Sequence, residues 1–157
     1  MNNKIVKDKF LIENLIYEVR GKQVMLDSDL ARLYECANGT KSINLAVNRN
    51  IERFPEDFYF QLTKEEYNNL KFQFETSNSS SNLGGVRKLP YVFTEQGVAM
   101  LATVLRTKIA SQMSISIMRA FVTMRKYISN NLIEQKFINK QVLKKHMKNM
   151  KNICNHI

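Results

Sequence analysis

The sequence predicts an α+β fold: a β-hairpin and short strands with a helix-turn-helix, followed by C-terminal helices. Short runs of alternating apolar and polar residues have the spacing of strands. Capping residues and glycines separate longer runs whose apolar residues recur every three or four positions, which is the spacing of helices. The 157 residues are 44% hydrophobic and 24% charged, an ordinary composition for a globular domain with an appendage.

Strands are expected at three places in the chain. Apolar residues on both sides of Gly21 predict a β-hairpin over residues 12–26, because glycine favours the tight turn between two strands. Strand spacing returns over residues 58–62, and residues 91–93 are a further candidate. These segments supply the β part of the predicted fold.

Two helices joined by a glycine-containing turn follow the hairpin. Residues 27–29 supply capping oxygens for a short helix that ends by Cys36. Residues 37–39 then form a turn, because Asn38 and Gly39 tolerate positive φ. A second helix is expected over residues 40–53, since the residue before Pro55 is biased away from helix. Such a unit places its second helix in the major groove of DNA.

The remaining helices are expected after further capping residues. Thr63 precedes a short helix over residues 64–72, and Thr94 precedes one over residues 95–105. A longer helix is expected over residues 108–129, with a core-facing stripe of apolar residues. The stripe consists of Ile109, Met113, Ile117, Ala120, Phe121, Met124 and Ile128.

Two segments are poor in such signals. Residues 76–85 are rich in Ser, Asn and Gly, which favours a loop. Beyond Asn130 the chain is Lys-rich and its apolar positions drift, so we expect a loosely packed helix or an oligomerisation segment there. The predicted domains are a DNA-binding domain over residues 12–128 and a Lys-rich helical tail over residues 129–157.

The positive charge is concentrated in the second half of the chain. Residues 1–75 hold 11 Lys or Arg and 12 Asp or Glu, whereas residues 76–157 hold 13 and 2. Such a field attracts polyanions, and nucleic acid is the most abundant one in the cytosol. A solvated basic tail that only aids solubility is the alternative interpretation.

Neither a membrane segment nor an oxidising compartment is indicated by the sequence. The longest apolar stretch, near residues 98–105, is far shorter than the roughly 20 residues of a membrane-spanning helix. Residues 1–8 are polar, with no continuous apolar segment after them. Cys36 and Cys154 are far apart in the sequence and are expected to be free thiols. We therefore expect a cytoplasmic protein.

One side of the second helix of the helix-turn-helix has the residue types that read DNA. A helical wheel places its apolar residues, Ile43, Ala46, Val47, Ile51 and Phe54, together on the buried side. The opposite arc consists of Lys41, Ser42, Asn44, Leu45, Asn48, Arg49 and, at its edge, Arg53. Asn can pair with adenine and Arg with guanine, while Lys and Ser contact phosphate. An ordinary amphipathic helix with a solvated face is the alternative.

Further basic residues are candidates for phosphate contacts. Lys108, Arg119 and Lys126 fall within a narrow arc of their helix and could follow a DNA backbone, although a charged outer face is an equally good interpretation. Arg87 and Lys88 complete the predicted DNA-binding set.

A metal-dependent nuclease is the enzyme to consider, and the sequence does not favour it. Such cleavage needs clustered carboxylates. Asp27 and Asp29 are better explained as helix caps, and Glu65 and Glu66 as first-turn residues favoured by the helix dipole. His146, Cys154 and His156 match no strong zinc spacing. We expect no enzymatic activity, no cofactor and no metal.

Three blocks of the sequence closely resemble a known phage-associated DNA-binding domain, the N-terminal domain of open reading frame six. The blocks are LDSDLARLY (26–34), TKSINLAVNRNIERFPEDFYFQLT (40–63) and LPYVFTEQGVAML (89–101). This family is related to the KilA-N and BRO-N domains, and the resemblance covers roughly residues 12–127. The turn over residues 36–39 is longer than the family's common form.

The resemblance implies an α+β domain that binds double-stranded DNA in phage and prophage regulators, often described as antirepressors. The Thr40-Lys41 start, Asn44, Asn48-Arg49-Asn50 and Arg53 match what looks like the family's reading helix. Many relatives have a further C-terminal effector domain. The resemblance therefore implies that the Lys-rich tail, residues 129–157, is either the remnant of such a domain or the start of a coiled coil.

Two other partners stay open. An antirepressor could instead sequester a phage repressor protein through exposed apolar residues such as Leu45 or the segment 132–150, with DNA binding secondary. A homodimer is expected because such units commonly pair over two half-sites.

Overall fold

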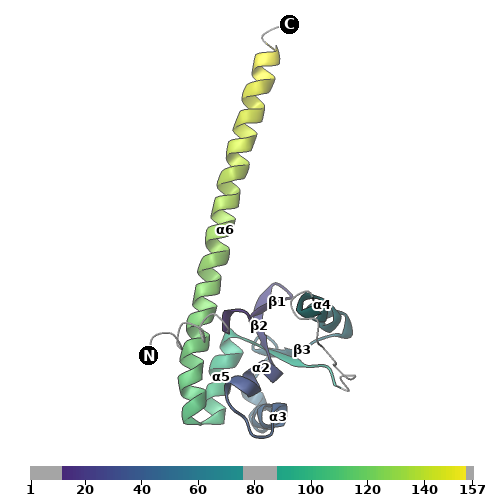
Figure 1. Ribbon diagram of the computed structural model, residues 1–157, viewed down its shortest axis with the longest axis vertical. Helices are drawn as coiled ribbons and strands as arrows, with labels where there is room; N and C mark the ends of the chain where they lie inside the picture. Colours follow the sequence, from purple (N-terminus) through teal and green to yellow (C-terminus); the bar gives the residue numbers. More distant parts are fainter. Residues whose placement is uncertain (1–11, 76–87, 155–157) are drawn as a thin grey trace. The chain divides into compact units, whose positions relative to one another are not determined.

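The computed structural model describes residues 12–75 and 88–154 (Figure 1). Contacts within the chain divide it into two units, Met1–Phe121 and Val122–Ile157. The first is an α+β unit with a four-stranded antiparallel sheet and short helices, and the second is helical. The predicted fold class is confirmed, whereas the domain division predicted between residues 128 and 129 stays a prediction.

The sheet has four short strands in the order β1-β2-β4-β3, and every neighbouring pair is antiparallel. Its strands are β1 (Tyr17–Val19), β2 (Lys22–Leu26), β3 (Tyr59–Gln61) and β4 (Tyr91–Thr94). The predicted strands are therefore confirmed. The central pair joins segments more than sixty residues apart, since Val24 of β2 lies opposite Thr94 of β4.

A two-residue turn closes the hairpin of β1 and β2. Val19 pairs with Lys22, so Arg20 and Gly21 form the turn. Both have positive φ, 54° and 70°, which is the conformation of a type I′ turn. The predicted hairpin is confirmed, with a non-glycine residue in the strained first position.

The described helices begin near the predicted positions, but α3 ends earlier and α6 ends later than predicted. They are α2 (Asp27–Leu33), α3 (Thr40–Arg49), the 3-10 helix η1 (Ile51–Arg53), α4 (Lys64–Glu75), α5 (Glu95–Leu105) and α6 (Lys108–Cys154). The bounds predicted for α5 are those observed. Its cap is also as predicted, because the Thr94 hydroxyl accepts a hydrogen bond from the Gly97 N–H at 3.4 Å.

Both faces of the sheet are covered. Successive side chains of a strand point to opposite faces, and residues on both faces of the central strands are buried. One face contributes Val19, Val24, Leu26, Phe60, Leu62 and Val92 to a cluster completed by Leu70 of α4. On the other face Met25 and Phe93 are also fully buried. There α2 contacts both central strands, α5 contacts β4, and α3 contacts α2 and α5. The helix-turn-helix is thus held by the sheet and by α5.

Helix α5 lies against the chain that leads into β3. A Cβ added to Gly97 would be 1.9 Å from the Phe58 carbonyl oxygen, a distance no side chain can occupy. The Thr94 N–H donates a hydrogen bond to the same carbonyl at 3.0 Å. Only glycine permits this close approach.

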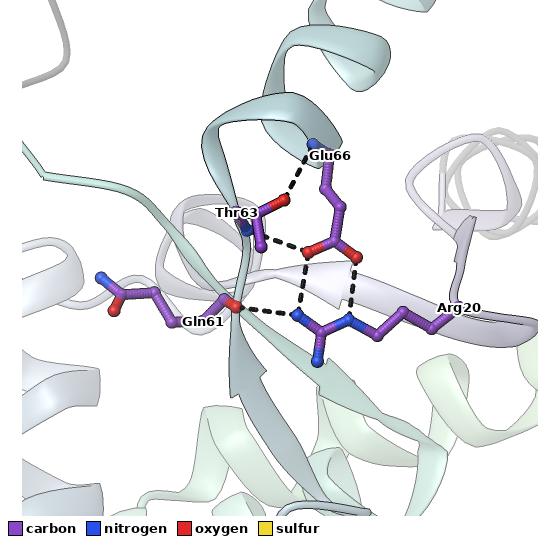
Figure 2. A network of polar contacts seen from close by, with 4 residues as sticks. All are labelled: Arg20, Gln61, Thr63 and Glu66. Carbon is purple, nitrogen blue, oxygen red and sulfur yellow. Dashed lines mark hydrogen bonds and ion pairs between the residues drawn. The ribbon is translucent and has the colours of Figure 1, made fainter.

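Helix α4 is attached to the hairpin by a polar network (Figure 2). The guanidinium of Arg20 donates two hydrogen bonds to Glu66, at 2.8 and 2.9 Å. Glu66 in turn accepts from the Thr63 N–H at 2.9 Å, and its own N–H donates to the Thr63 hydroxyl at 3.2 Å. This capping box confirms Thr63 as the cap of α4. The pKa of Glu66 is lowered to about 2, mainly by the hydrogen bonds from Arg20 and to a smaller extent by those from Thr63.

The first helix of the helix-turn-helix ends at Leu33, before Cys36 as predicted. In the turn Gly39 has the predicted positive φ, but the other residue with positive φ is Glu35 rather than Asn38. No side chain caps the helix at Leu26. The cap position itself is therefore not as predicted, but Asp27 does supply an oxygen to the first turn: its carboxylate accepts hydrogen bonds from the Ser28 N–H at 2.8 Å and from the Tyr91 N–H at 3.2 Å.

The second helix is shorter than the predicted range 40–53. Regular helix ends at Arg49, and Asn50 leaves helical geometry with φ −131° and ψ 35°. The chain continues as η1, which rotates Ile51 out of the buried stripe to 51% exposure. The wheel had placed Ile51 with the core, and that placement is wrong because it assumed an unbroken helix.

Helix α6 runs without interruption past the predicted end at Ser129. In the first unit its buried stripe consists of Ala110, Ser114, Ile117, Ala120 and Phe121. Ile109 and Ile128, both expected in that stripe, are more than one third exposed. Within residues 12–75 and 88–154, no helix is long and apolar enough to cross a membrane.

Candidate nucleic-acid interface

Helix α3 presents one polar face to solvent and one apolar face to the core. Ile43 and Val47 are buried, whereas Lys41, Asn48 and Arg49 are exposed. Positions 41, 48 and 49 fall on one arc of a helix, opposite positions 43 and 47. The two sides predicted by the wheel are confirmed for these residues. Leu45 lies on the polar arc and is half exposed, which is unusual for a large apolar side chain.

Two backbone features limit α3 at its ends. Gly39 precedes the helix with φ 56° and ψ −137°, a conformation that side chains disfavour. At the other end the Asn50 side chain donates a hydrogen bond to the Ala46 carbonyl at 2.9 Å. The resemblance had included Asn50 in the reading segment, but its amide is used to close the helix.

The other predicted residues of this segment lie in different surroundings. Thr40, Ser42 and Asn44 are half buried. Thr40 and Asn44 line a cavity, described below, rather than the open face. Arg53 is exposed but belongs to η1, beyond the break at Asn50. The exposed face of α3 is therefore centred on Lys41, Leu45, Asn48 and Arg49.

Of the two candidates that precede β4, only one lies in the described part of the chain. Lys88 is exposed and lines the same cavity as Thr40 and Asn44, so the fold brings residues 44 positions apart together. Arg87 lies outside the described residues. The grouping of Lys88 with α3 could not be seen from their separation in the sequence.

The basic row predicted on α6 is divided between the two units. Lys108 and Arg119 are exposed in the first unit, eleven residues apart and hence on one side of the helix. Lys126 is exposed in the second unit. None of the three lines the cavity beside α3.

The cavity beside α3 has a volume of about 470 Å³ and is formed by α2, α3, α4 and the start of β4. Its charged lining residues are Asp27, Asp29, Arg32, Lys71 and Lys88, and Tyr67 and Tyr91 contribute rings. The sequence reasoning missed Arg32, Tyr67 and Lys71 as site residues. The available signals were the spacings of three between Asp29 and Arg32 and of four between Tyr67 and Lys71.

Two carboxylates are buried at this cavity. Burial raises the pKa of Asp27, although hydrogen bonds from the Tyr91 and Ser28 N–H groups oppose the rise. Burial likewise raises the pKa of Asp29, opposed by its hydrogen bond from Arg32. Burial, and then the charge of Asp27, raise the pKa of Tyr67.

No metal-binding group is formed by the described residues. Within residues 12–75 and 88–154, no three His, Cys, Asp or Glu side chains are placed to hold a metal ion. That the protein has no enzymatic activity stays a prediction.

The comparisons with known proteins assign the family. The model of the ORF6N domain matches residues 14–104, which contain every described strand, helices α2 to α4, and α5 except for its last residue. No curated protein and no solved structure matches the chain. The match spans more than half of the sequence and includes the complete helix-turn-helix. The chain therefore belongs to the ORF6N family, a phage-associated domain related to KilA-N.

Proposed function

We propose that this protein is a sequence-specific DNA-binding regulator of the phage type, which reads the major groove with α3. The observation that supports it most is the exposed arc of Lys41, Asn48 and Arg49 on a helix whose other side is fixed in the core. A helix anchored in this way presents its polar side chains in a defined orientation, as base reading requires.

Each residue on the arc has a chemistry that suits DNA. The Asn48 amide can both donate to and accept from adenine, and the Arg49 guanidinium can donate two hydrogen bonds to guanine. Leu45 can contact the methyl group of thymine, which accounts for an apolar side chain at half exposure. Lys41, in the first turn, suits a phosphate oxygen.

The basic second half of the chain supports binding through a term independent of base sequence. Residues 122–154 contain eight Lys or Arg and one Glu. Cations near the phosphate backbone release condensed counterions, so affinity falls as salt concentration rises. Units of this kind commonly pair over two half-sites, and we propose a homodimer as the binding form.

The experiment that tests this function starts with selection of preferred duplexes from a random library. Fluorescence anisotropy then compares the selected duplex with a shuffled one over a salt series. We expect a steep fall in affinity with salt, and losses of about 1–3 kcal/mol for Asn48→Ala and Arg49→Ala on the selected duplex. Lys22→Ala, which removes one exposed charge from the hairpin, is the control. Unchanged discrimination in both α3 variants would contradict the proposal.

A protein-binding antirepressor is the second candidate, and the apolar residues of the second unit favour it. Leu132, Phe137, Leu143 and Met147 are each more than half exposed. Exposed apolar side chains in such numbers are typical of a surface that binds another protein. If the protein acts by sequestering a repressor, the complex tolerates Arg49→Ala but loses affinity with Leu132→Ala and Leu143→Ala. Light scattering on the mixture with the phage repressor measures this.

A further inference from the structure

The cavity between α2, α3, α4 and β4 has features that the reading of the major groove does not use. Its volume of about 470 Å³ lies within the usual range of small-ligand pockets, about 300–1,000 Å³. Arg32 and Lys88 at this cavity are exposed, whereas Asp29 is only 5% exposed. A carboxylate therefore lies at the buried end and cations lie toward solvent.

The buried carboxylate has an unused acceptor. Oδ1 of Asp29 accepts a hydrogen bond from Arg32, but Oδ2 is buried and has no hydrogen-bond partner among the residues that the structure describes. Buried polar atoms are nearly always paired, so an unpaired one at a cavity indicates a donor from outside the described part of the chain, such as a bound ligand. Both N–H and O–H groups donate to a carboxylate oxygen, and the exocyclic amino group of a base is one such N–H donor.

The remainder of the lining suits a ligand that has both a flat aromatic ring and a negatively charged group. The Lys71 ammonium lies 4.8 Å from the centre of the Tyr67 ring, and that of Lys88 lies 5.6 Å from the centre of the Tyr91 ring. Tyr91 is held in place because its ring stacks on Tyr59 with centres 5.1 Å apart. Ammonium groups suit a phosphate, and tyrosine rings suit the flat face of a base.

We propose that this cavity binds a single nucleotide whose base has an exocyclic amino group, with that group donating to Asp29 and the phosphate close to Lys71 and Lys88. The proposal rests on the proposed function in one respect, since Thr40 and Asn44 of α3 share the cavity wall and an unpaired nucleotide of bound DNA is one source of the ligand. A free mononucleotide is the other source.

The first arm of the test uses free mononucleotides and the full-length protein. Calorimetric titrations compare dCMP and dAMP with dTMP, which has no exocyclic amino group. A hydrogen bond to a charged group corresponds to a preference of roughly tenfold or more for dCMP and dAMP over dTMP. Asp29→Asn puts an amide donor where Oδ2 was, so this preference is lost or reversed. A purely structural role of Asp29 would lower stability but would not change the ranking of bases.

Two further variants keep the result interpretable if Asp29→Asn fails to fold. Lys71→Ala and Lys88→Ala change side chains nearer the surface, and each is expected to weaken all mononucleotides about equally, by several-fold. Lys64→Ala, at the exposed start of the same helix as Lys71, is the matched control and leaves binding unchanged. Equal weakening by Lys64→Ala would mean general charge attraction and would overturn the assignment of the site.

The second arm uses duplexes that contain one unpaired cytosine or one unpaired thymine. If the cytosine duplex binds more tightly than the thymine duplex and Asp29→Asn removes the difference, the site binds a nucleotide of DNA. If dCMP binds but the two duplexes bind equally, the site binds free nucleotides. If no mononucleotide binds and the two duplexes bind equally, the proposal is overturned. If the binding of fully paired duplexes still depends on Arg49, the proposed function stands even though the nucleotide site does not. If dCMP binds but no duplex does, the nucleotide site stands and the proposed function does not.

Discussion

The two stretches of α6 have the same secondary structure but different surroundings. In Lys108–Phe121 the residues Ile117 and Phe121 are buried, whereas in Val122–Cys154 Phe137 is 63% exposed and Leu132 is 57% exposed. The first stretch also has a buried hydrogen bond between the hydroxyls of Tyr34 and Ser114, 2.9 Å apart. Helical periodicity thus predicts a helix, but burial depends on whether another surface covers its apolar side.

The largest expected effect comes from a matched pair of phenylalanines. Phe121→Ala removes a side chain that is 1% exposed and should lower the free energy of unfolding by about 3–5 kcal/mol. Phe137→Ala, on the same helix, should change it by less than about 0.5 kcal/mol. Urea unfolding at several protein concentrations measures both. An equal loss for Phe137→Ala would mean that the second stretch is covered by a second copy.

The next largest effect is expected where Gly97 of α5 lies against the backbone of Phe58 in the first unit. Gly97→Ala places a Cβ against the Phe58 carbonyl oxygen, and the backbone must move to relieve the overlap. We expect a loss of about 1–3 kcal/mol. Ser129→Ala, at an exposed position of the second stretch, should leave the urea midpoint unchanged. A tolerated Gly97→Ala would contradict the packing of α5 described above.

A smaller effect is expected from the hydroxyl that joins α2 and α6. Tyr34→Phe leaves the buried Ser114 hydroxyl without its partner and should cost about 1 kcal/mol, whereas Tyr127→Phe in the exposed stretch should cost nothing. Burial raises the pKa of Tyr34 to about 12. Its contribution to stability is therefore complete below pH 10 and is lost as the pH rises toward 12. Tyr34→Phe should weaken that alkaline decline in thermal melts.

The smallest effect is expected at the attachment of α4, because exposed ion pairs contribute little to stability. The pKa of Glu66 is lowered to about 2 by Arg20, so the pair stabilises the fold above pH 4.5 and ceases to do so as the pH falls toward 2. Glu66→Gln should lower Tm by at most a few degrees at neutral pH, with the difference from wild type vanishing near pH 2. A constant difference at all pH values would contradict the ion pair.

Local signals explain what could be predicted from the sequence. The hairpin at Gly21, the caps Thr63 and Thr94, and the bounds of α5 depend on neighbouring residues, and each is confirmed. The end of α3 was misplaced because Asn50 bonds back to Ala46 and begins a different helix type three residues before Arg53. No local pattern distinguishes that ending from a continuing helix.

The candidate site was only partly predictable for a different reason. The buried and exposed sides of α3 follow from helical geometry alone, so Lys41, Asn48 and Arg49 were found. The cavity joins Asp29, Asn44, Lys71 and Lys88, which are distant in sequence and meet because β4 pairs with β2, α3 contacts α2, and α4 packs on the sheet. Long-range pairing of this kind cannot be read from spacing.

The most direct test of the central claim compares the contributions of α3 and of the second unit to DNA binding in one measurement. The quantity is the ratio of affinities for a selected and a shuffled duplex, measured by anisotropy for wild type, Arg49→Ala, and the double variant Lys144→Ala with Lys145→Ala. If α3 reads bases, Arg49→Ala brings the ratio close to one, while the double variant weakens both duplexes and keeps the ratio. A ratio that survives Arg49→Ala but is lost in the double variant would contradict the account.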